Sequence, residues 1–386
     1  MDPSQSFNFF PVPTDIHFGC GAVRKLPELL RPLGASRPLI VSDPGVPDLT
    51  ARIAGILSSA GMDAVVWDRV KPDSGSTLIE EGRAELAANL CDSVVGLGGG
   101  SSLDTAKAIA AMATNPGSPL EYAGLHKLRN RPLPVVAIPT TAGTGSEVTL
   151  WSVFTDDANG LKVAIGSFLL YPAVAVCDPE LTIGLPPALT AATGMDALAH
   201  AIECFTNNAC QPISGALALR AIELIGRHLR SAVLNGRQLE SRYGVMLAAT
   251  MAGIAMNPTR LGLAHALAMP LGSWDLHIPH GVILAVTLPL VMDFNFPAAP
   301  DRFLDVARAL GERVDGLPRM EAAGRAAAAV RSLAADIGIP ASLRDYGLRE
   351  EHVPLVVAEA MKSGNVTVNP RCTGAEDLTR ILRQAL

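Results

Sequence analysis

The first half of the chain alternates short apolar runs with longer segments of helical periodicity, and this alternation limits the fold more than any other feature. The apolar runs have the length of buried strands. Strands that alternate with helices of about 10–15 residues predict βαβ units and a mostly parallel sheet. The predicted strands are 38–42, 64–67, 93–97 and 134–138, and the predicted helices between them are 47–60, 77–90 and 102–113.

Three further β-rich segments complete the α/β half, at 148–154, 162–165 and 173–177. The second half of the chain has a different pattern. Beyond Leu185 the chain is rich in Ala and Leu, with a periodicity typical of helices. The predicted helices there are 189–206, 212–230, 239–256, 322–337 and 375–386. We therefore expect an α/β domain over residues 1–187 and an all-helical domain over residues 188–386.

The composition excludes several classes of protein. Of the 386 residues, 49% are hydrophobic and 18% charged, so the chain can bury large cores and is not mainly disordered. A net charge of −6 argues against nucleic-acid and membrane partners. The apolar stretch 282–291 is shorter than the roughly 20 residues that cross a bilayer. Six scattered cysteines and a first segment without the features of a signal peptide predict reduced thiols and a cytoplasmic protein.

A glycine-rich turn follows the predicted strand 93–97. Three glycines (98–100) and two serines lead directly into the next predicted helix, which carries Asp104. Glycines let a ligand approach the backbone, and a helix N-terminus attracts anions, so Gly99, Gly100 and Ser101 are candidates for binding a pyrophosphate. The turn matches neither of the common phosphate-binding motifs. A turn that only packs the helix on the strand explains it equally well.

Two other loops follow predicted strands. Residues 139–147 contain four hydroxyl side chains and two glycines, which fits a surface for ribose, phosphate or nicotinamide. Asp43 follows the strand 38–42, where a carboxylate can accept hydrogen bonds from a ribose 2′-hydroxyl. Its charge would repel a 2′-phosphate, which favours NAD over NADP. An Asp that only forms a turn before Pro44 is an equal alternative.

The helical half contains a cluster of metal-ligand residue types. Asp196 and His200 are four residues apart on a predicted helix, so they share one face. Their neighbours are mostly Ala, Leu and Ile, and a carboxylate there needs a partner. His265, His277 and His280 fall within 16 residues of sequence, with His265 in a helical pattern and His280 in an expected turn. One Asp with two or three His suits Fe²⁺ or Zn²⁺, although each histidine alone is more often a packed or surface residue.

Several long segments of the chain, in the same order, resemble the iron-containing (group III) alcohol dehydrogenases over essentially the whole length. The segments are 98–107 (GGGSSLDTAK), 139–149 (PTTAGTGSEVT), 178–203, 262–281 and 369–371 (NPR). The resemblance implies an N-terminal dinucleotide-binding α/β domain and a C-terminal helical domain with the architecture of dehydroquinate synthase. It also implies a cleft between the domains that holds NAD(P) and a divalent metal, and assembly as a homodimer or higher homo-oligomer.

The resemblance assigns a role to each matching position. The metal ligands would be Asp196, His200, His265 and His280. Among the cofactor contacts, Asp43 would lie at the adenosine ribose and Lys162 near a ribose. The pyrophosphate would be held by Gly99, Gly100 and Ser101, and Asp104 lies in the helix that follows. The nicotinamide half would contact Thr140, Thr141, Thr144 and Ser146. The implied reaction is a metal-dependent hydride transfer that interconverts a small alcohol and its aldehyde or ketone. NAD is the expected cofactor, with NADP as the alternative. Fe²⁺ is the expected ion, with Zn²⁺ as an alternative.

One position departs from the family pattern. The family usually has a second histidine four residues after the third ligand, where this chain has Met269. On a helix Met269 would share a face with His265, so it is expected beside the substrate pocket, where it cannot transfer a proton. His277 is our candidate for the proton relay, since an imidazole titrates near neutral pH. A structural role for His277 explains it equally well.

Three other functions remain open on the same scaffold. A branch of the family reduces maleylacetate, but typically with an altered metal motif. Cyclases that resemble dehydroquinate synthase share the architecture but carry a more basic pocket than the helical half of this chain offers. A protein that binds nucleotide and metal without turnover is the third alternative.

Overall fold

The computed structural model describes residues 10–273 and 278–386. Contacts within the chain divide it into two compact units, one over Pro13–Leu185 and one that contains Pro186–Leu386 together with the described residues 10–12. We propose that these units are the two domains expected from the sequence, with residues 10–12 belonging to the helical unit instead of the α/β unit.

The α/β unit is built on a parallel sheet of six strands. Their order is β1-β9-β6-β4-β2-β3, and every pair in it is parallel. The strands are β1 (Asp15–Phe18), β2 (Pro38–Ser42), β3 (Val65–Trp67), β4 (Ser93–Gly98), β6 (Val135–Pro139) and β9 (Val174–Cys177). The parallel α/β architecture predicted from the sequence is therefore confirmed.

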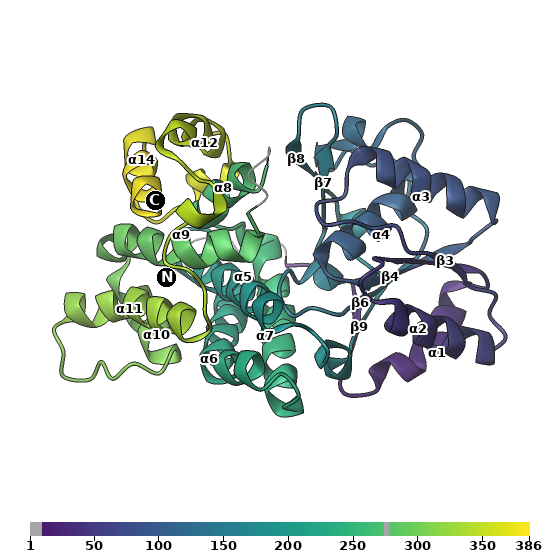
Figure 1. The fold of residues 1–386 in the computed structure, drawn as a ribbon, viewed down its shortest axis with the longest axis horizontal. Helices are drawn as coiled ribbons and strands as arrows, with labels where there is room; N and C mark the ends of the chain where they lie inside the picture. The colour runs from purple at the N-terminus through teal and green to yellow at the C-terminus, as the bar shows by residue number, and fades with distance from the viewer. Residues whose placement is uncertain (1–9, 274–277) are drawn as a thin grey trace. The chain divides into compact units, whose positions relative to one another are not determined.

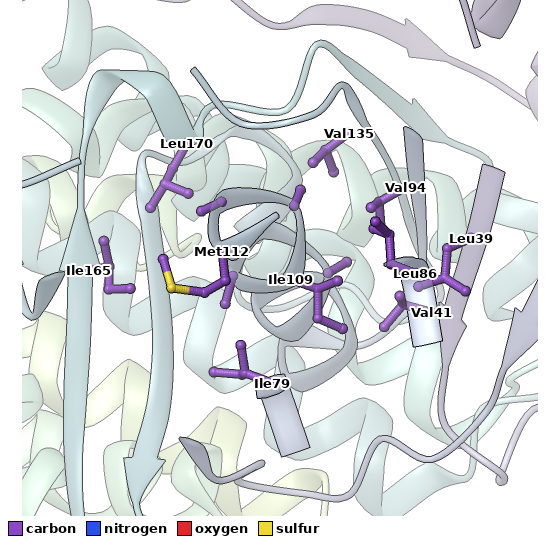
Figure 2. Close-up of a cluster of buried hydrophobic side chains, with 14 of the residues drawn as sticks. Leu39, Val41, Ile79, Leu86, Val94, Ile109, Met112, Val135, Ile165 and Leu170 are labelled. Atoms are coloured by element: carbon purple, nitrogen blue, oxygen red, sulfur yellow. The ribbon is translucent and has the colours of Figure 1, made fainter. Parts of the chain in front are cut away.

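Helices cover both faces of this sheet (Figure 1). On one face, α1 (Leu26–Leu30) and α2 (Pro47–Ser59) bury Ile40 of β2. The neighbouring residues Leu39 and Val41 point to the opposite face, because side chains alternate along a strand. There they pack with α3 (Ser76–Ala88) and α4 (Gly100–Met112). Figure 2 shows Ile109 and Met112 of α4 among the side chains of this second core.

A second, smaller sheet joins the core on the α4 side. It has the order β5-β8-β7, with β5 (Gly124–Leu125), β7 (Trp151–Asp156) and β8 (Leu161–Gly166). Ile165 of β8 packs in the same cluster as α4. The long hairpin of β7 and β8 therefore extends the core instead of adding strands to the main sheet.

Among its described residues, the second unit consists of helices and the loops that connect them. Its central helix is α5 (Pro187–Thr206), which packs against α6 (Pro212–Leu234), α7 (Leu239–Thr259) and α9 (His280–Asn295). Small alanine side chains along α5 allow this close packing on several sides. The remaining helices are α8 (Leu263–Leu271), α10 (Pro300–Ala309), α11 (Arg319–Asp336), α12 (Val353–Ala360), α13 (Gly364–Thr367) and α14 (Ala375–Gln384). The predicted all-helical half is thus confirmed.

Helix α9 corrects two expectations. The apolar stretch 282–291 belongs to a longer helical segment, His280–Ala298, which in length and composition could cross a membrane. Within the unit 72% of its most apolar stretch is buried, as in the core helix of a globular protein. His280, expected in a turn, is the first residue of α9, because Pro279 has the extended conformation of a residue that precedes a helix.

Asp92 fastens the beginnings of two central strands. Its carboxylate accepts hydrogen bonds from Ser36 N (2.8 Å), Arg37 N (3.1 Å) and the Ser93 hydroxyl (2.9 Å). Burial alone would raise the pKa of Asp92, but the hydrogen bonds from Ser36 and its neighbours lower it below the usual value. These bonds connect the chain before β2 to the chain before β4, and so they support the pairing of Pro38 with Ser93.

We expect Asp92→Asn to lower the free energy of unfolding at pH 7 by about 1–3 kcal/mol, as for hydrogen bonds to a charged group. Because the folded-state pKa is lowered, the carboxylate stabilises the fold fully above its unfolded pKa, near 3.9, and this stabilisation is lost as the pH falls from there through the lowered folded-state pKa. Urea denaturation at pH 7 and at about pH 2 would measure both effects. Asp63→Asn is the control, since Asp63 is exposed in its ion pair with Arg37 and should contribute less than about 1 kcal/mol. Equal effects of the two substitutions at pH 7 would contradict the role of Asp92.

Candidate functional site

The carboxyl ends of three adjacent strands, β2, β4 and β6, bring the predicted cofactor residues together. Gly98 ends β4 with φ of 144°, a conformation that favours glycine. A Cβ atom at Gly98 would lie 2.4 Å from the Ser102 hydroxyl and 3.2 Å from the Asp43 carboxylate. Asp43, which follows β2, therefore lies directly beside the glycine turn.

The loop after β6 lies on the other side of this turn. Thr140 N donates a hydrogen bond to Gly98 O (2.9 Å). A Cβ atom at Gly100 would lie 2.6 Å from Thr144, and one at Gly99 would lie 3.4 Å from Thr141. Longer side chains at these glycines would fill the space between the two loops. The N-terminus of α4 begins here, and its first N–H groups have no partner within the helix, so the turn is suited to an anion.

Asp104 and Ser146, both predicted as cofactor contacts, form a hydrogen bond with each other. Asp104 accepts hydrogen bonds from the Ser146 hydroxyl (2.5 Å) and from Val153 N (3.0 Å), and it forms an ion pair with Lys107 (3.0 Å). Lys107 is completely buried, and it also donates to Ser146 O (3.0 Å) and to Trp151 O. Burial lowers the pKa of the Lys107 ammonium despite the neighbouring carboxylate. We propose that these side chains fix the loop after β6 on α4 and so act on the cofactor indirectly.

Asp43 and Lys162 both have local partners. Asp43 accepts hydrogen bonds from Gly45 N (2.8 Å) and from the Ser102 hydroxyl (3.4 Å), so it forms a turn and also faces the glycine turn. Lys162 of β8 forms an ion pair with Asp73 (2.7 Å), and Asp73 N donates to the Ser101 hydroxyl (3.3 Å). Both interpretations of Asp43 therefore remain compatible with the structure.

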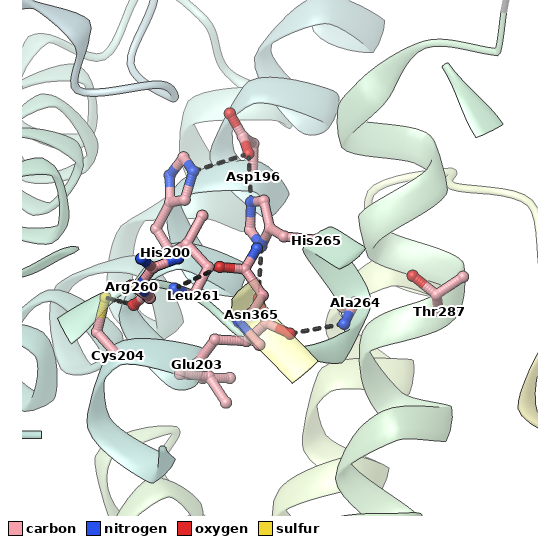
Figure 3. A network of polar contacts seen from close by, with 12 residues as sticks. Asp196, His200, Glu203, Cys204, Arg260, Leu261, Ala264, His265, Thr287 and Asn365 are labelled. Carbon is pink, nitrogen blue, oxygen red and sulfur yellow. Dashed lines mark hydrogen bonds and ion pairs between the residues drawn. The ribbon is translucent and has the colours of Figure 1, made fainter. Parts of the chain in front are cut away.

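In the helical unit, four predicted metal ligands come from three helices. Asp196 and His200 lie on α5, His265 on α8 and His280 at the start of α9. Asp196 Oδ1 lies 3.5 Å from His200 Nε2, 3.6 Å from His265 Nε2 and 3.9 Å from His280 Nε2. Figure 3 shows the contacts of Asp196 with His200 and His265. Donor atoms of Asp196, His265 and His280 all lie within 4.8 Å of one another, and His200 joins them through Asp196.

These distances fit a bound cation. Two ligands at about 2.1 Å from a tetrahedral ion are about 3.4 Å apart. Asp196 Oδ1 and His265 Nε2 are buried and have no hydrogen-bond partner among the described residues, although both are strong hydrogen-bonding groups. A divalent ion would satisfy both atoms. A set of three nitrogens and one oxygen suits Fe²⁺ or Zn²⁺ and does not distinguish them.

The charges of the site also favour a cation. Burial would raise the pKa of Asp196, but the surrounding histidines hold it below its usual range. For His265, burial works to lower the pKa, and the nearby carboxylates of Glu203 and Asp196 raise it to about 9. The carboxylates of Asp196 and Glu203 therefore stabilise a positive charge at this point, which a bound divalent ion would supply.

Gly281 allows α9 to approach α5 at the level of the ligands. A Cβ atom there would lie 1.9 Å from the carbonyl oxygen of Ala192, which is part of the α5 backbone. Ala192 is one turn before Asp196, and Gly281 follows His280. The close approach of the two helices thus sets the distance between these two ligands.

Glu203 was not among the predicted site residues. It lies on α5, seven residues after Asp196 and so on the same face. It is buried, and its Oε2 lies 2.5 Å from His265 Nδ1. The sequence signal was available, since Asp196, His200 and Glu203 form one stripe of a helix, but only the structure shows that the stripe faces α8.

The two remaining predicted residues differ in outcome. His277, the candidate proton relay, lies outside the described residues. Met269 lies on α8, one turn after His265, and is half-buried where His265 is buried. Its position beside a substrate stays a prediction.

Comparison with protein families places both halves of the chain. Residues 13–179 match the family described as "Iron-containing alcohol dehydrogenase", and residues 190–386 match "Fe-containing alcohol dehydrogenase family, C-terminal". Together these matches cover most of the chain.

Individual relatives agree with these matches. The chain is 40% identical to the 1,3-propanediol dehydrogenase of Klebsiella pneumoniae over 97% of each chain. It is 38% identical to the NAD-dependent methanol dehydrogenase of Bacillus methanolicus, with 98% of this chain and 100% of the relative aligned. A crystal structure of a 1,3-propanediol oxidoreductase superposes with a TM-score of 0.96 and 40% identity, covering 99% of this chain and all of the other.

We expect Gly281→Ala to weaken divalent metal binding by about 10-fold or more, comparable to the loss of a group that orients a ligand. The new methyl group has to move α9 away from α5 and His280 away from Asp196. Competition of the protein with a chromogenic chelator for Zn²⁺ would measure the affinity. Gly324→Ala is the matched control, because this helical glycine of the same unit has room for a methyl group. Unchanged affinity in a folded Gly281→Ala protein would show that the close approach does not set the site.

Proposed function

The chain belongs to the iron-containing alcohol dehydrogenase family, and on this basis we propose that it is an NAD-dependent enzyme that interconverts a short alcohol and its aldehyde or ketone. The family membership establishes an oxidoreductase of the alcohol dehydrogenase type. The choice of NAD, the assignment of individual residues and the size of the substrate are our proposals.

One observation carries the proposal: the buried Asp196 Oδ1 and His265 Nε2 atoms, without hydrogen-bond partners among the described residues, converge with two further imidazoles. We propose that Asp196, His200, His265 and His280 hold Fe²⁺ or Zn²⁺. When bound, such an ion supplies a Lewis acid that stabilises an alkoxide or polarises a carbonyl oxygen. The single carboxylate among the four proposed ligands leaves the centre with net positive charge, as that role requires.

The α/β unit supplies the groups for the nucleotide. The glycine turn and the N-terminus of α4 suit the pyrophosphate, since backbone N–H groups there are directed outward from the helix. Thr140, Thr141 and Thr144 follow β6 next to this turn, where their hydroxyls would orient the nicotinamide half. The network of Asp104, Lys107 and Ser146 would keep that loop rigid when the nucleotide binds and leaves.

The proton of the alcohol needs a route that avoids Met269. A thioether neither gives nor accepts a proton at neutral pH, so Met269 would make the pocket more apolar and take no part in proton transfer. His277 stays our predicted relay. An imidazole there would accept the proton on one ring nitrogen and release it from the other to solvent.

The relatives support a short substrate. The similar proteins include dehydrogenases named for 1,3-propanediol and for methanol. We therefore propose a short primary alcohol or diol as the substrate, with the uncharged Met269 favouring an uncharged molecule.

The proposed reaction predicts metal-dependent oxidation of NADH by short aldehydes. Protein freed of metal should be inactive, and anaerobic loading with Fe²⁺ or Zn²⁺ should restore turnover, followed as the loss of absorbance of NADH. His265→Ala should reduce the rate to that of the metal-free protein. The control is His352→Ala, since His352 ends the short helical turn Glu350–His352 and accepts a hydrogen bond from the nearby Arg349 N. Turnover that survives both a chelator and His265→Ala would overturn the proposal.

The proposed place of Asp43 predicts a change of cofactor preference. We expect Asp43→Asn to raise the ratio of kcat/KM for NADPH to that for NADH by about tenfold, which corresponds to about 1.4 kcal/mol. The reason is that Asn keeps an oxygen for Gly45 N but loses the charge that repels a 2′-phosphate. Asp48→Asn removes the same charge from the exposed first turn of α2 and is the matched control. An equal ratio in both variants would leave Asp43 as a turn residue only.

A further inference from the structure

One face of α5 carries three ionisable side chains at successive turns: Asp196, His200 and Glu203. The first two meet at the metal site, with Asp196 Oδ1 and His200 Nε2 at 3.5 Å. Glu203 does not face that point. Its carboxylate is directed at the beginning of α8, where it contacts the residues that lead into His265 and His265 itself (Figure 3).

Both oxygens of Glu203 are occupied by donors from one short segment. Oε1 accepts a hydrogen bond from Ala264 N (2.7 Å), and Oε2 accepts one from Gly262 N (2.9 Å). Oε2 also lies 2.5 Å from His265 Nδ1. A single buried side chain thus caps the N-terminus of α8 and contacts the metal-ligand candidate that α8 carries.

Gly262 makes this arrangement sterically feasible. A Cβ atom at Gly262 would lie 2.7 Å from Glu203 Oε1 and 2.9 Å from its Cδ. Since only glycine leaves this space to the carboxylate, the backbone of one helix end is shaped around one side chain of another helix. The contact is therefore specific in geometry as well as in charge.

The contact determines which nitrogen of His265 carries the proton. The carboxylate already accepts from two backbone N–H groups, so it acts as an acceptor and His265 Nδ1 has to be the donor. In a neutral imidazole the other nitrogen, Nε2, then has a free lone pair. His265 Nε2 is the atom that lies 3.6 Å from Asp196 Oδ1.

We infer that Glu203 is a positioning residue that holds His265 in the orientation and the tautomer needed to bind a divalent metal through Nε2. This inference rests on the proposed metal centre and adds a residue that contacts no metal itself. Carboxylates and carbonyls that orient metal-bound histidines in this way affect metal affinity strongly.

A glutamine at this position would have the right shape and the wrong donors. Its amide has one oxygen for three donors, and its NH₂ group can only donate. If the NH₂ group faces His265, Nδ1 must accept, and the proton moves to Nε2, where it blocks the metal. Aspartate keeps the charge but is one methylene shorter, so it cannot reach all three donors.

The experiment compares Glu203→Gln with Asp178→Asn. Asp178 is a matched control, because it too is a buried carboxylate with three donors, which are here the backbone N–H groups of Gly21, Val23 and Glu180 in the α/β unit. Zn²⁺ affinity is measured by competition with a chelator, and folding by thermal unfolding of the metal-free proteins. We expect Glu203→Gln to weaken Zn²⁺ binding by about 10- to 100-fold. Asp178→Asn should lower thermal stability and leave Zn²⁺ affinity within about twofold of wild type, because among the described residues its carboxylate binds backbone N–H groups of the α/β unit and orients none of the proposed ligands.

A second measurement needs no folded variant. In ¹⁵N-histidine-labelled, Zn²⁺-loaded wild-type protein, the ring nitrogens of His265 report the tautomer directly. We expect a proton on Nδ1 and the metal on Nε2.

A third comparison uses Glu203→Asp. This variant keeps the charge, so it should retain part of the Zn²⁺ affinity that Glu203→Gln loses. A proton on Nε2, or wild-type affinity in Glu203→Gln, would overturn the role of Glu203. Wild-type protein that binds no Zn²⁺ would instead contradict the proposed function itself.

Discussion

A buried negative charge organises the helical unit. Asp196 lies inside α5 among alanine, leucine and methionine, where an ionised carboxylate without compensation would be costly. The helices around it satisfy this requirement by directing three imidazoles at one carboxylate oxygen. The close approach at Gly281 and the capped start of α8 bring these side chains to one point. An apolar residue at position 196 would pack there without the cost of burying a charge.

The α/β unit meets a different requirement by a different means. Its proposed nucleotide site consists of backbone N–H groups and hydroxyl groups at the carboxyl edge of a parallel sheet, where adjacent strands place their following loops side by side. The rigidity there comes from Lys107, whose ammonium connects α4 to the loop after β6 and to the start of β7. A buried lysine that bonds to carbonyl oxygens fixes a loop more firmly than apolar contacts would, because its donors are directional.

Much of this could be predicted from the sequence, and the limits have physical causes. Short apolar runs identified five of the six strands of the main sheet, all but β1, and the 3.6-residue periodicity identified most of the long helices. Helix α9 was missed because it is apolar on all sides and its first turn contains Gly281, so a helix start was taken for a turn. The ligand types and their grouping were readable from Asp196, His200, His265 and His280. The role of Glu203 was not, because a carboxylate on a helix face does not show in sequence which partner from another helix it will meet.

The placement of the ligands on α5, α8 and α9 links the ion to the folding of the whole helical unit. Helix α5 is far in sequence from α8 and α9, so an unfolded chain presents no preformed site, and an ion that binds only the folded state draws the equilibrium toward it. An ion present at 100 times its dissociation constant would add about 2.7 kcal/mol to the stability of the fold. A cell short of the ion would then contain not only an inactive enzyme but also a larger fraction of unfolded chain, so the supply of the metal would control the amount of this protein as well as its activity.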